Sequence, residues 1–302
     1  MGSVLENLPP ESRVAILRLR SLGDCVLTTP ALAILKRARP DLRVAVVVEE
    51  RFRDIFDGHP DVDEILPPEP AVVRKFLPRL CLNLHGGGRS AWITALSGAR
   101  YRAGFGHFRQ QFVYNLHIPR AQEILGEERT VHTAEHMASA MFWLGAARRE
   151  IPRAQLVSRA TGPTRPLAVI HPVAAAPEKT WRADGFREVA EHLRQSGLEV
   201  VFIGAEGDDL SPFDGFRVQR GRPLAEIDDL LATASLFVGN DSGPAHMAAA
   251  FGLPVVVIFG ESDPAIWGPW RTASEVVRAR GGIRNVGASQ VITATARLRV
   301  HA

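Results

Sequence analysis

The chain has 302 residues, about twice the length of an ordinary domain, so its length favours two domains. Hydrophobic residues make up 46% of it and charged residues 23%, which excludes a disordered, fibrous or low-complexity protein. The first residues carry acids where a secretory signal is basic and apolar, and no apolar run reaches the roughly 20 residues of a spanning helix. We therefore expect a cytoplasmic protein, in which Cys25 and Cys81 are packing residues.

The first half alternates apolar runs with helical periods. Residues 14–19 predict a buried strand, and after the polar turn Ser21–Asp24 a helical period runs from 26 to 38. Further strands are expected at 43–48, 63–66, 80–84 and 101–105, and further helices at 90–96 and 133–144. This alternation predicts a parallel, doubly wound sheet.

Proline and glycine punctuate residues 152–166, where no clear period is visible, so we place the domain linker there. The pattern then restarts, with strands expected at 167–171, 199–203, 236–238 and 255–259 and helices at 184–195, 225–233, 244–251 and 289–299. The sequence thus predicts an α/β domain over 1–155, a second over 156–288, and a C-terminal helix within 289–302. Two Rossmann-like halves in tandem make a cleft between the domains the expected ligand site.

Positive charge is concentrated in one segment of a chain whose net charge is only +3. Residues 71–122 contain no acid and eight cations, namely Arg74, Lys75, Arg79, Arg89, Arg100, Arg102, Arg109 and Arg120. Such a segment is either a solvated face of an arginine-rich protein or a surface that attracts an anionic partner. Composition alone leaves both readings open.

Three short segments carry residues suited to chemistry. Residues 238–246 (VGNDSGPAH) follow an expected strand and open a helix, where free amides and the helix dipole favour an anion such as a pyrophosphate; helix capping would explain the same residues. Lys179 lies in the loop after the first strand of the second domain and could neutralise a departing diphosphate, or simply be solvated. Asp24, at a strand-to-helix junction, is either a helix cap or a general base.

Several common sites are absent from the sequence. There is no G-x-G-x-x-G after either leading strand and no G-x-x-x-x-G-K-[ST], which disfavours NAD enzymes and P-loop ATPases. We find neither a metal-binding histidine motif nor a G-x-S-x-G elbow, and no recognisable nucleic-acid-binding module. We expect no metal and no cofactor.

Four motifs in the right order closely resemble glycosyltransferase family 9, the ADP-heptose:lipopolysaccharide heptosyltransferases. They are LRLRSLGD (17–24), TPAL (29–32), VGNDSGPAH (238–246) and FGESDP (259–264). The resemblance implies a GT-B fold, with two Rossmann-like domains facing each other across a cleft. It places the acceptor in the N-terminal domain and the nucleotide-sugar in the C-terminal one, and it implies that the last helix crosses back to the N-terminal domain.

The resemblance also implies an activity and its residues. Heptose would pass from ADP-heptose to a lipopolysaccharide-core acceptor with inversion and without a metal, Asp24 acting as general base and Lys179 stabilising the leaving ADP. The implied donor-binding residues are Asp241 for the sugar, Ser242 and Gly243 for the diphosphate, His246 and His171 beside them, and Glu206 for the ribose.

On the acceptor side we expect Ser21 together with the arginines Arg89, Arg100, Arg102 and Arg109, which are interleaved with aromatic residues. An acceptor bearing phosphates or carboxylates fits this surface, and peripheral contact with the anionic inner membrane follows from it. Two departures from the family pattern matter: Val173–Ala175 offer the phosphates only backbone amides, and Asn83 and His85 replace the usual Asp and Gln.

These departures keep alternatives open. One is a family member that uses another nucleotide-sugar or an acceptor other than lipopolysaccharide. Another, from a different class, is a catalytically silent protein that binds a sugar nucleotide or glycan. The presence of both Asp24 and Lys179 argues against silence, because a binding module needs no base.

Overall fold

The computed structural model of the chain describes residues 3–160 and 166–299. The chain folds as two compact units, Met1–Val157 and Ser158–Ala302, so the division falls two residues after the expected boundary. Residues 161–165 of the expected linker lie outside the described residues, as do residues 300–302 of the expected C-terminal segment.

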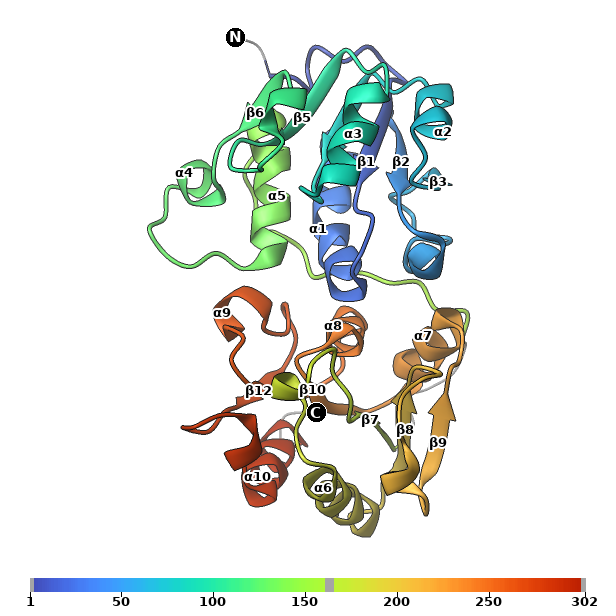
Figure 1. Cartoon of the computed structure of the whole chain (residues 1–302), viewed down its shortest axis with the longest axis vertical. Helices are drawn as coiled ribbons and strands as arrows, with labels where there is room; N and C mark the ends of the chain where they lie inside the picture. Colours follow the sequence, from blue (N-terminus) through green and yellow to red (C-terminus); the bar gives the residue numbers. More distant parts are fainter. Residues whose placement is uncertain (1–2, 161–165, 300–302) are drawn as a thin grey trace. The chain divides into compact units, whose positions relative to one another are not determined.

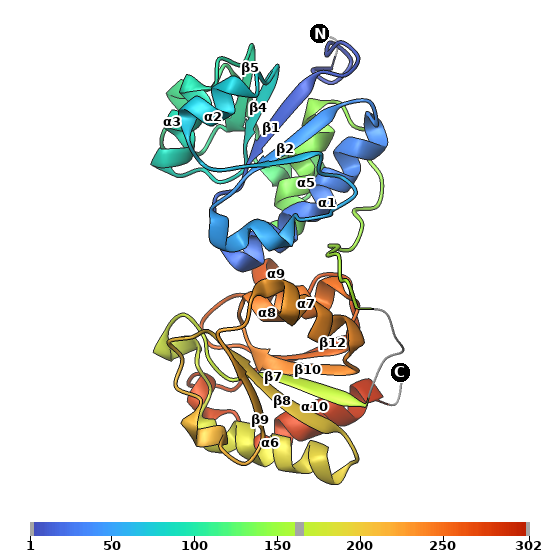
Figure 2. The same ribbon diagram turned by 90° about the vertical axis from the view of Figure 1, so that its right-hand side faces the viewer.

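The first unit is a parallel sheet with helices on both faces. Its elements are β1 (Arg13–Leu17), α1 (Leu22–Ala38), β2 (Arg43–Val47), β3 (Glu64–Leu66), α2 (Pro70–Lys75), β4 (Leu80–Asn83), α3 (Gly88–Leu96), β5 (Tyr101–Phe105), β6 (Leu116–Ile118), α4 (Ala121–Leu125) and α5 (Thr133–Leu144). The six strands lie in the order β3-β2-β1-β4-β5-β6. Helices α1 and α5 cover one face of this sheet, and α2 and α3 cover the other (Figure 2).

The strands of this sheet are apolar on both faces because helices bury both. All four residues of β4 are buried, and only the first residue of β1 and of β2 has appreciable exposure. In a parallel sheet this produces continuous apolar runs rather than alternation. Those runs are the signal by which the sequence revealed the central strands.

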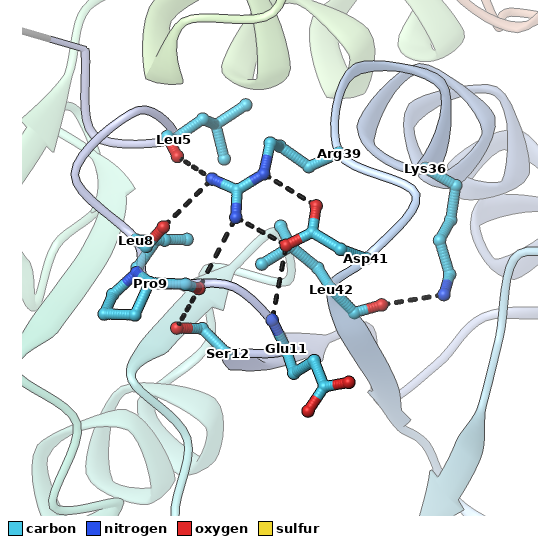
Figure 3. A network of polar contacts seen from close by, with 9 residues as sticks. All are labelled: Leu5, Leu8, Pro9, Glu11, Ser12, Lys36, Arg39, Asp41 and Leu42. Atoms are coloured by element: carbon cyan, nitrogen blue, oxygen red, sulfur yellow. Dashed lines mark hydrogen bonds and ion pairs between the residues drawn. The ribbon is translucent and has the colours of Figure 1, made fainter.

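An arginine just after α1 fastens the segment that leads into β1 (Figure 3). The Arg39 guanidinium donates from Nε to Asp41 Oδ1 at 2.8 Å and from Nη2 to Asp41 Oδ2 at 2.6 Å, and it also donates to the carbonyls of Leu5 and Leu8. The hydrogen bonds that Arg39 donates to Asp41 lower the pKa of Asp41 to about 2. The network fixes the amino-terminal segment against the end of α1.

The second unit repeats the architecture (Figure 1). Its elements are β7 (Leu167–His171), α6 (Ala183–Gln195), β8 (Glu199–Gly204), β9 (Arg217–Arg220), α7 (Leu224–Thr233), β10 (Leu236–Asn240), α8 (Gly243–Ala250), β11 (Val255–Ile258), α9 (Pro264–Trp267), β12 (Ser274–Val277) and α10 (Ala288–Arg299). The strand order is β12-β11-β10-β7-β8-β9, again all parallel. Helices α7 and α8 pack on one face, and α6 and α10 on the other (Figure 2).

Both sheets have a point where the strand order reverses. In the first unit it lies between β1 and β4, and in the second between β7 and β10. Loops that leave neighbouring strands there turn to opposite faces, which opens a crevice at the carboxyl edge where α/β sheets bind ligands. The loops after these four strands are therefore where chemistry is expected.

The structure corrects several boundaries. Helix α1 begins at Leu22 rather than 26, so Asp24 lies in its first turn and not in a loop. Strands β6, β9 and β12, which form edges of the two sheets, were not predicted. Residues 288–299 form α10, which packs against α6 and β12 of the second unit, and the crossing of the last helix to the first domain stays a prediction.

Candidate active site

The strand-order reversal of the first unit carries the carboxylate of Asp24. Ser21 is the residue before α1, and its hydroxyl donates to Asp24 Oδ2 at 3.1 Å. The guanidinium of Arg18, which follows β1, lies 3.5 Å from the same oxygen. Asp24 is therefore not the helix cap, and its carboxylate is held by one hydroxyl and one cation while a fifth of the side chain stays exposed.

Arg18 is an unusual neighbour because its side chain is only 4% exposed. It donates to the carbonyl of Leu84 and to the sulfur of Met137, while its Nε has no partner among the described residues. Burial lowers the pKa of the Arg18 guanidinium and the charge of Asp24 opposes this shift. Because a guanidinium stays protonated in proteins, Arg18 is a fixed positive charge beneath Asp24.

His85 lies across the same reversal point, two residues after β4. Asn83 shapes its turn, since Asn83 Oδ1 accepts from the amides of His85 at 2.9 Å and Gly86 at 3.0 Å. Burial, followed by the charges of Arg18 and Arg20, lowers the pKa of His85. Its buried Nδ1 has no partner in the described part of the chain, so a neutral imidazole with unused hydrogen-bonding capacity lies at the edge that carries Asp24.

In the second unit, the loop after β7 is fastened at both ends by one buried side chain. Asn240, the last residue of β10, accepts from the amide of Trp181 at 3.0 Å and donates to the carbonyl of Pro172 at 2.9 Å. The Trp181 indole donates to the carbonyl of Val286. Residues 172–181 therefore form a loop with fixed ends, and Lys179 lies inside it.

The middle of this loop depends on a glycine in the loop after β11. A Cβ on Gly260 would lie 2.4 Å from the carbonyl oxygen of Glu178, which is closer than any real Cβ contact. Since the atom in the way belongs to the backbone, no side-chain rotation relieves the contact. Gly260 thus lets the lysine-bearing loop lie against the neighbouring loop.

Lys179 and Asp241 form an ion pair at the carboxyl edge of this sheet. Lys179 Nζ lies 3.1 Å from Asp241 Oδ2, with the lysine side chain 37% exposed and the aspartate 8%. Ser242 and Gly243 come next, at the start of α8, where backbone amides have no partner within the helix. An ammonium group, free amides and the positive end of a helix dipole converge here, which is the chemistry that binds a diphosphate.

His171 ends β7 and contacts the same turn. Its Nδ1 lies 3.0 Å from the Ser242 hydroxyl. Burial lowers the pKa of His171 to about 4, with the charge of Asp208 opposing the shift. The ring is therefore neutral near pH 7 and orients the Ser242 hydroxyl without adding charge. His246, the other histidine expected at the donor site, is buried within α8.

Glu206 lies in the loop after β8, the strand next to β7 on the side away from β10. Its side chain is exposed and its backbone lies over Gly221, where an added Cβ would be 3.0 Å from the Glu206 Cβ.

A hollow of about 610 Å³ lies against the loop 172–181 that carries Lys179, and it is lined by residues 174–177 and 180–182 and by Arg284. Its volume is in the range of ligand sites for molecules of nucleotide size.

The arginines expected on the acceptor side have three different environments. Arg109 is exposed in the loop after β5, at the carboxyl edge of the first sheet. Arg89, in the first turn of α3, donates to the carbonyl of Pro68 and pairs with Glu49 at 3.5 Å. Arg102 is near the amino end of β5 and donates to the carbonyls of Val113 and Ala99, so it braces the sheet and is not brought together with Asp24.

Within residues 3–160 and 166–299, no three His, Cys, Asp or Glu side chains gather in a way that could hold a metal ion. The same residues contain no helix with the length and apolar character needed to cross a membrane.

The comparison with protein families decides which family carries this site. Residues 79–286 match the model of glycosyltransferase family 9 (heptosyltransferase), which is more than half of the chain. The chain belongs to glycosyltransferase family 9. This confirms the resemblance inferred from the four motifs, and with it the assignment as a glycosyltransferase.

Known proteins resemble this family 9 glycosyltransferase along most of its length. Lipopolysaccharide heptosyltransferase 3 of Escherichia coli K12 is 26% identical over an alignment that covers 83% of each chain. The crystal structure of a family 9 glycosyl transferase from Veillonella parvula matches with a TM-score of 0.85 at 21% identity, covering 97% of this chain and 98% of the other. The E. coli ADP-heptose lps heptosyltransferase II matches with a TM-score of 0.80 at 20% identity, covering 96% and 99%. The structural matches confirm the α/β GT-B fold.

Three residues of this site were not among the predicted site residues. Asn240 lay within a recognised motif, but its role as a clamp depends on two backbone groups 59 and 68 residues away. Arg18 directly follows an apolar strand and lies close to Asp24 in the sequence, and a charge in that position was the available signal. His85 was noticed only as a departure from the family pattern, and its position opposite β1 follows from the strand order.

Proposed function

We propose that this protein transfers heptose from ADP-heptose to an anionic acceptor of the lipopolysaccharide type, with inversion at the anomeric carbon. Membership in glycosyltransferase family 9 supports the reaction class. Its relatives include a lipopolysaccharide heptosyltransferase and an ADP-heptose lps heptosyltransferase, and these support the sugar, the nucleotide and the acceptor.

One observation carries the donor side of the proposal: Lys179, held by Asp241, lies at the amino end of α8. When the bond between the anomeric carbon and the diphosphate oxygen breaks, that oxygen keeps the electron pair and its negative charge grows. The Lys179 ammonium and the amides of Ser242 and Gly243 would stabilise this charge. Asp241, released from Lys179 by the diphosphate, would accept a hydrogen bond from a hydroxyl of the sugar.

On the acceptor side, Asp24 would take the proton from the attacking hydroxyl as its oxygen bonds to the anomeric carbon. The hydroxyl of Ser21 and the guanidinium of Arg18 hold the carboxylate in one orientation, and a single displacement of this kind inverts the configuration. Arg109 and Arg89 are the arginines that we propose for the anionic groups of the acceptor, and Glu206 is the residue that we propose for the ribose.

We further propose that the reaction needs neither a metal nor a cofactor beyond the nucleotide-sugar. The support is chemical: a fixed ammonium and free amides supply the positive charge that a departing diphosphate requires. We expect turnover to persist in a strong chelator, and activity restored only by a divalent cation would contradict metal independence.

We also propose that the enzyme works in the cytoplasm, in peripheral contact with the membrane that carries its acceptor.

Thermal unfolding with a panel of nucleotides tests the donor. A ligand that binds only the folded protein at a hundred times its Kd raises the free energy of unfolding by about 2.7 kcal/mol. We expect ADP and ADP-heptose to stabilise the protein and UDP, GDP and CDP to leave it unchanged. Selectivity for another nucleotide would keep the fold and discard ADP-heptose as donor, and a uniform lack of response would favour a silent scaffold.

A further inference from the structure

One face of the first unit exposes large apolar side chains where a water-facing surface is normally polar. The described residues include six exposed large hydrophobic side chains, and four of them belong to the acid-free segment 71–122. These four are Leu77 (69% exposed), Trp92 (58%), Leu96 (50%) and Phe112 (72%). We call the surface formed by α2, α3 and the short helix η2 (Gln111–Val113) the α2–α3 face.

The α3 residues of this face form one stripe. Arg89, Trp92 and Leu96 are spaced by three and four residues, which places them on the same side of the helix. The opposite side, with Ser90, Ala91 and Thr94, is buried. The apolar stripe is therefore the outer surface of α3, and packing of the unit does not account for it.

The neighbouring elements extend the stripe into a patch. Helix α3 packs beside α2 and beside η2, and Figure 2 shows α2 and α3 on the same side of the sheet. Val113 of η2 packs inward against Ala91, while its neighbour Phe112 is exposed. Leu77 lies two residues after the end of α2. Exposed apolar patches of this kind mark protein or membrane contacts.

The charge of this face selects between these partners. Arg74, Lys75 and Arg100 are exposed, and none of them makes an ion pair with any residue that the structure describes. Arg74 lies beside Gly98, at the end of α3, which places this cation next to the apolar stripe. A second copy of the chain would bring like charges together, whereas an anionic lipid surface offers both a negative charge and an apolar interior.

We propose that the α2–α3 face docks on an anionic phospholipid bilayer, with Trp92, Leu96 and Phe112 entering the interface and Arg74, Lys75 and Arg100 contacting the lipid phosphates. Aromatic and leucine side chains beside cations are the composition of surfaces that lie on membranes. The inference deepens the proposed peripheral membrane contact by naming its surface. It does not depend on the sugar or the nucleotide.

Co-sedimentation with vesicles tests the proposal without any turnover. We expect the wild-type protein to bind vesicles of equal parts phosphatidylcholine and phosphatidylglycerol, more weakly at high salt, and not to bind phosphatidylcholine alone. Each neutralised cation at a membrane surface lowers the partition coefficient about fivefold, so Arg74→Gln with Lys75→Gln should lower it about 25-fold. Trp92→Ser with Leu96→Ser should lower the partition coefficient at least tenfold, because the variant loses the free energy gained when these two apolar side chains are partly buried in the membrane.

Matched controls lie in the second unit and at its border. Val157→Ser with Val276→Ser removes exposed apolar groups elsewhere, and Arg187→Gln with Arg280→Gln removes exposed cations elsewhere. Both controls should bind vesicles as the wild type does. Equal binding by wild type and α2–α3 variants would overturn the proposal, as would wild type that ignores anionic vesicles. A change of oligomeric state in Trp92→Ser with unchanged vesicle binding would instead show that the face joins protein copies. Nucleotide-dependent stabilisation in the same preparations reports on the proposed function separately.

Discussion

Replacing Gly260 by alanine should disable the donor site while the sheet around it survives. The added Cβ would lie 2.4 Å from the Glu178 carbonyl oxygen, and an ordinary contact needs 3.4 Å or more, so the two loops must separate by about 1 Å. Overpacking of this kind costs about 1–3 kcal/mol. Gly260 has no positive φ, so the substitution acts through this contact and not through backbone strain.

The displaced residue directly precedes Lys179, whose ammonium lies 3.1 Å from Asp241. A shift of about 1 Å in a positioning group costs on the order of 100-fold in rate, and we expect kcat to fall by that factor and ADP affinity to fall with it. Gly207→Ala is the matched control, because that glycine is exposed in the same unit and an added Cβ would meet no atom within 4 Å. Calorimetric titration with ADP and steady-state turnover measure both effects. If Gly260→Ala binds ADP and turns over as well as Gly207→Ala does, the account of the lysine loop is refuted.

Three further predictions concern His171, Asn240 and the two arginines Arg102 and Arg109. His171 has a folded-state pKa of about 4, whereas the ordinary value is 6.5, so His171 in the unfolded chain binds a proton at higher pH than in the folded chain. The free energy of unfolding should therefore fall by about 3 kcal/mol as the pH drops from 6.5 to 4. Urea unfolding of His171→Asn should show a flatter pH dependence than the wild type, and an unchanged slope would contradict the assignment. Asn240→Ala leaves two backbone groups without partners and should weaken ADP binding about tenfold in a titration, whereas unaltered affinity would show that the loop does not need this clamp. Arg102→Gln should lower the free energy of unfolding, measured in urea, by about 1–2 kcal/mol without raising the KM for an anionic acceptor. Arg109→Gln should raise that KM without lowering the free energy of unfolding. A raised KM in Arg102→Gln and not in Arg109→Gln would show that Arg102 belongs to the acceptor surface.

The central strands could be predicted because helices bury both faces of each sheet. Strands β1, β4, β7 and β11 are continuous apolar runs for that reason. Of the four edge strands only β3 was recognised, and β6, β9 and β12 were missed because each is short and carries polar residues among its apolar ones. Arg217–Arg220, with a charge at each end, has no apolar period at all.

The site was predictable where a residue acts through its own chemistry and its place after a strand. Lys179, Asp241 and Ser242 were identified in this way, and the structure brings them to one edge. Residues that act by contacting distant backbone were not predictable. Asn240, and the requirement for Gly260 opposite Glu178, depend on which loops the strand order makes neighbours.

The extent of helix α1 illustrates the limit in another way. Gly23 and Asp24 weaken the helical period, so the sequence suggested a loop, whereas the helix begins at Leu22. The consequence is chemical, because Ser21 precedes the helix and lies within hydrogen-bonding distance of Asp24. A local pattern therefore located the carboxylate and did not reveal the group that orients it.

The most direct test of the central claim is the release of ADP from ADP-heptose in the presence of a deacylated lipopolysaccharide-core acceptor, comparing wild type with Asp24→Asn. The substitution keeps the shape of the side chain and removes its ability to take a proton. We predict that the variant binds ADP as the wild type does and that its kcat is lower by about 100- to 10,000-fold, the usual contribution of a general base. Undiminished ADP release by Asp24→Asn would contradict the assignment of Asp24 as the base and the mechanism built on it.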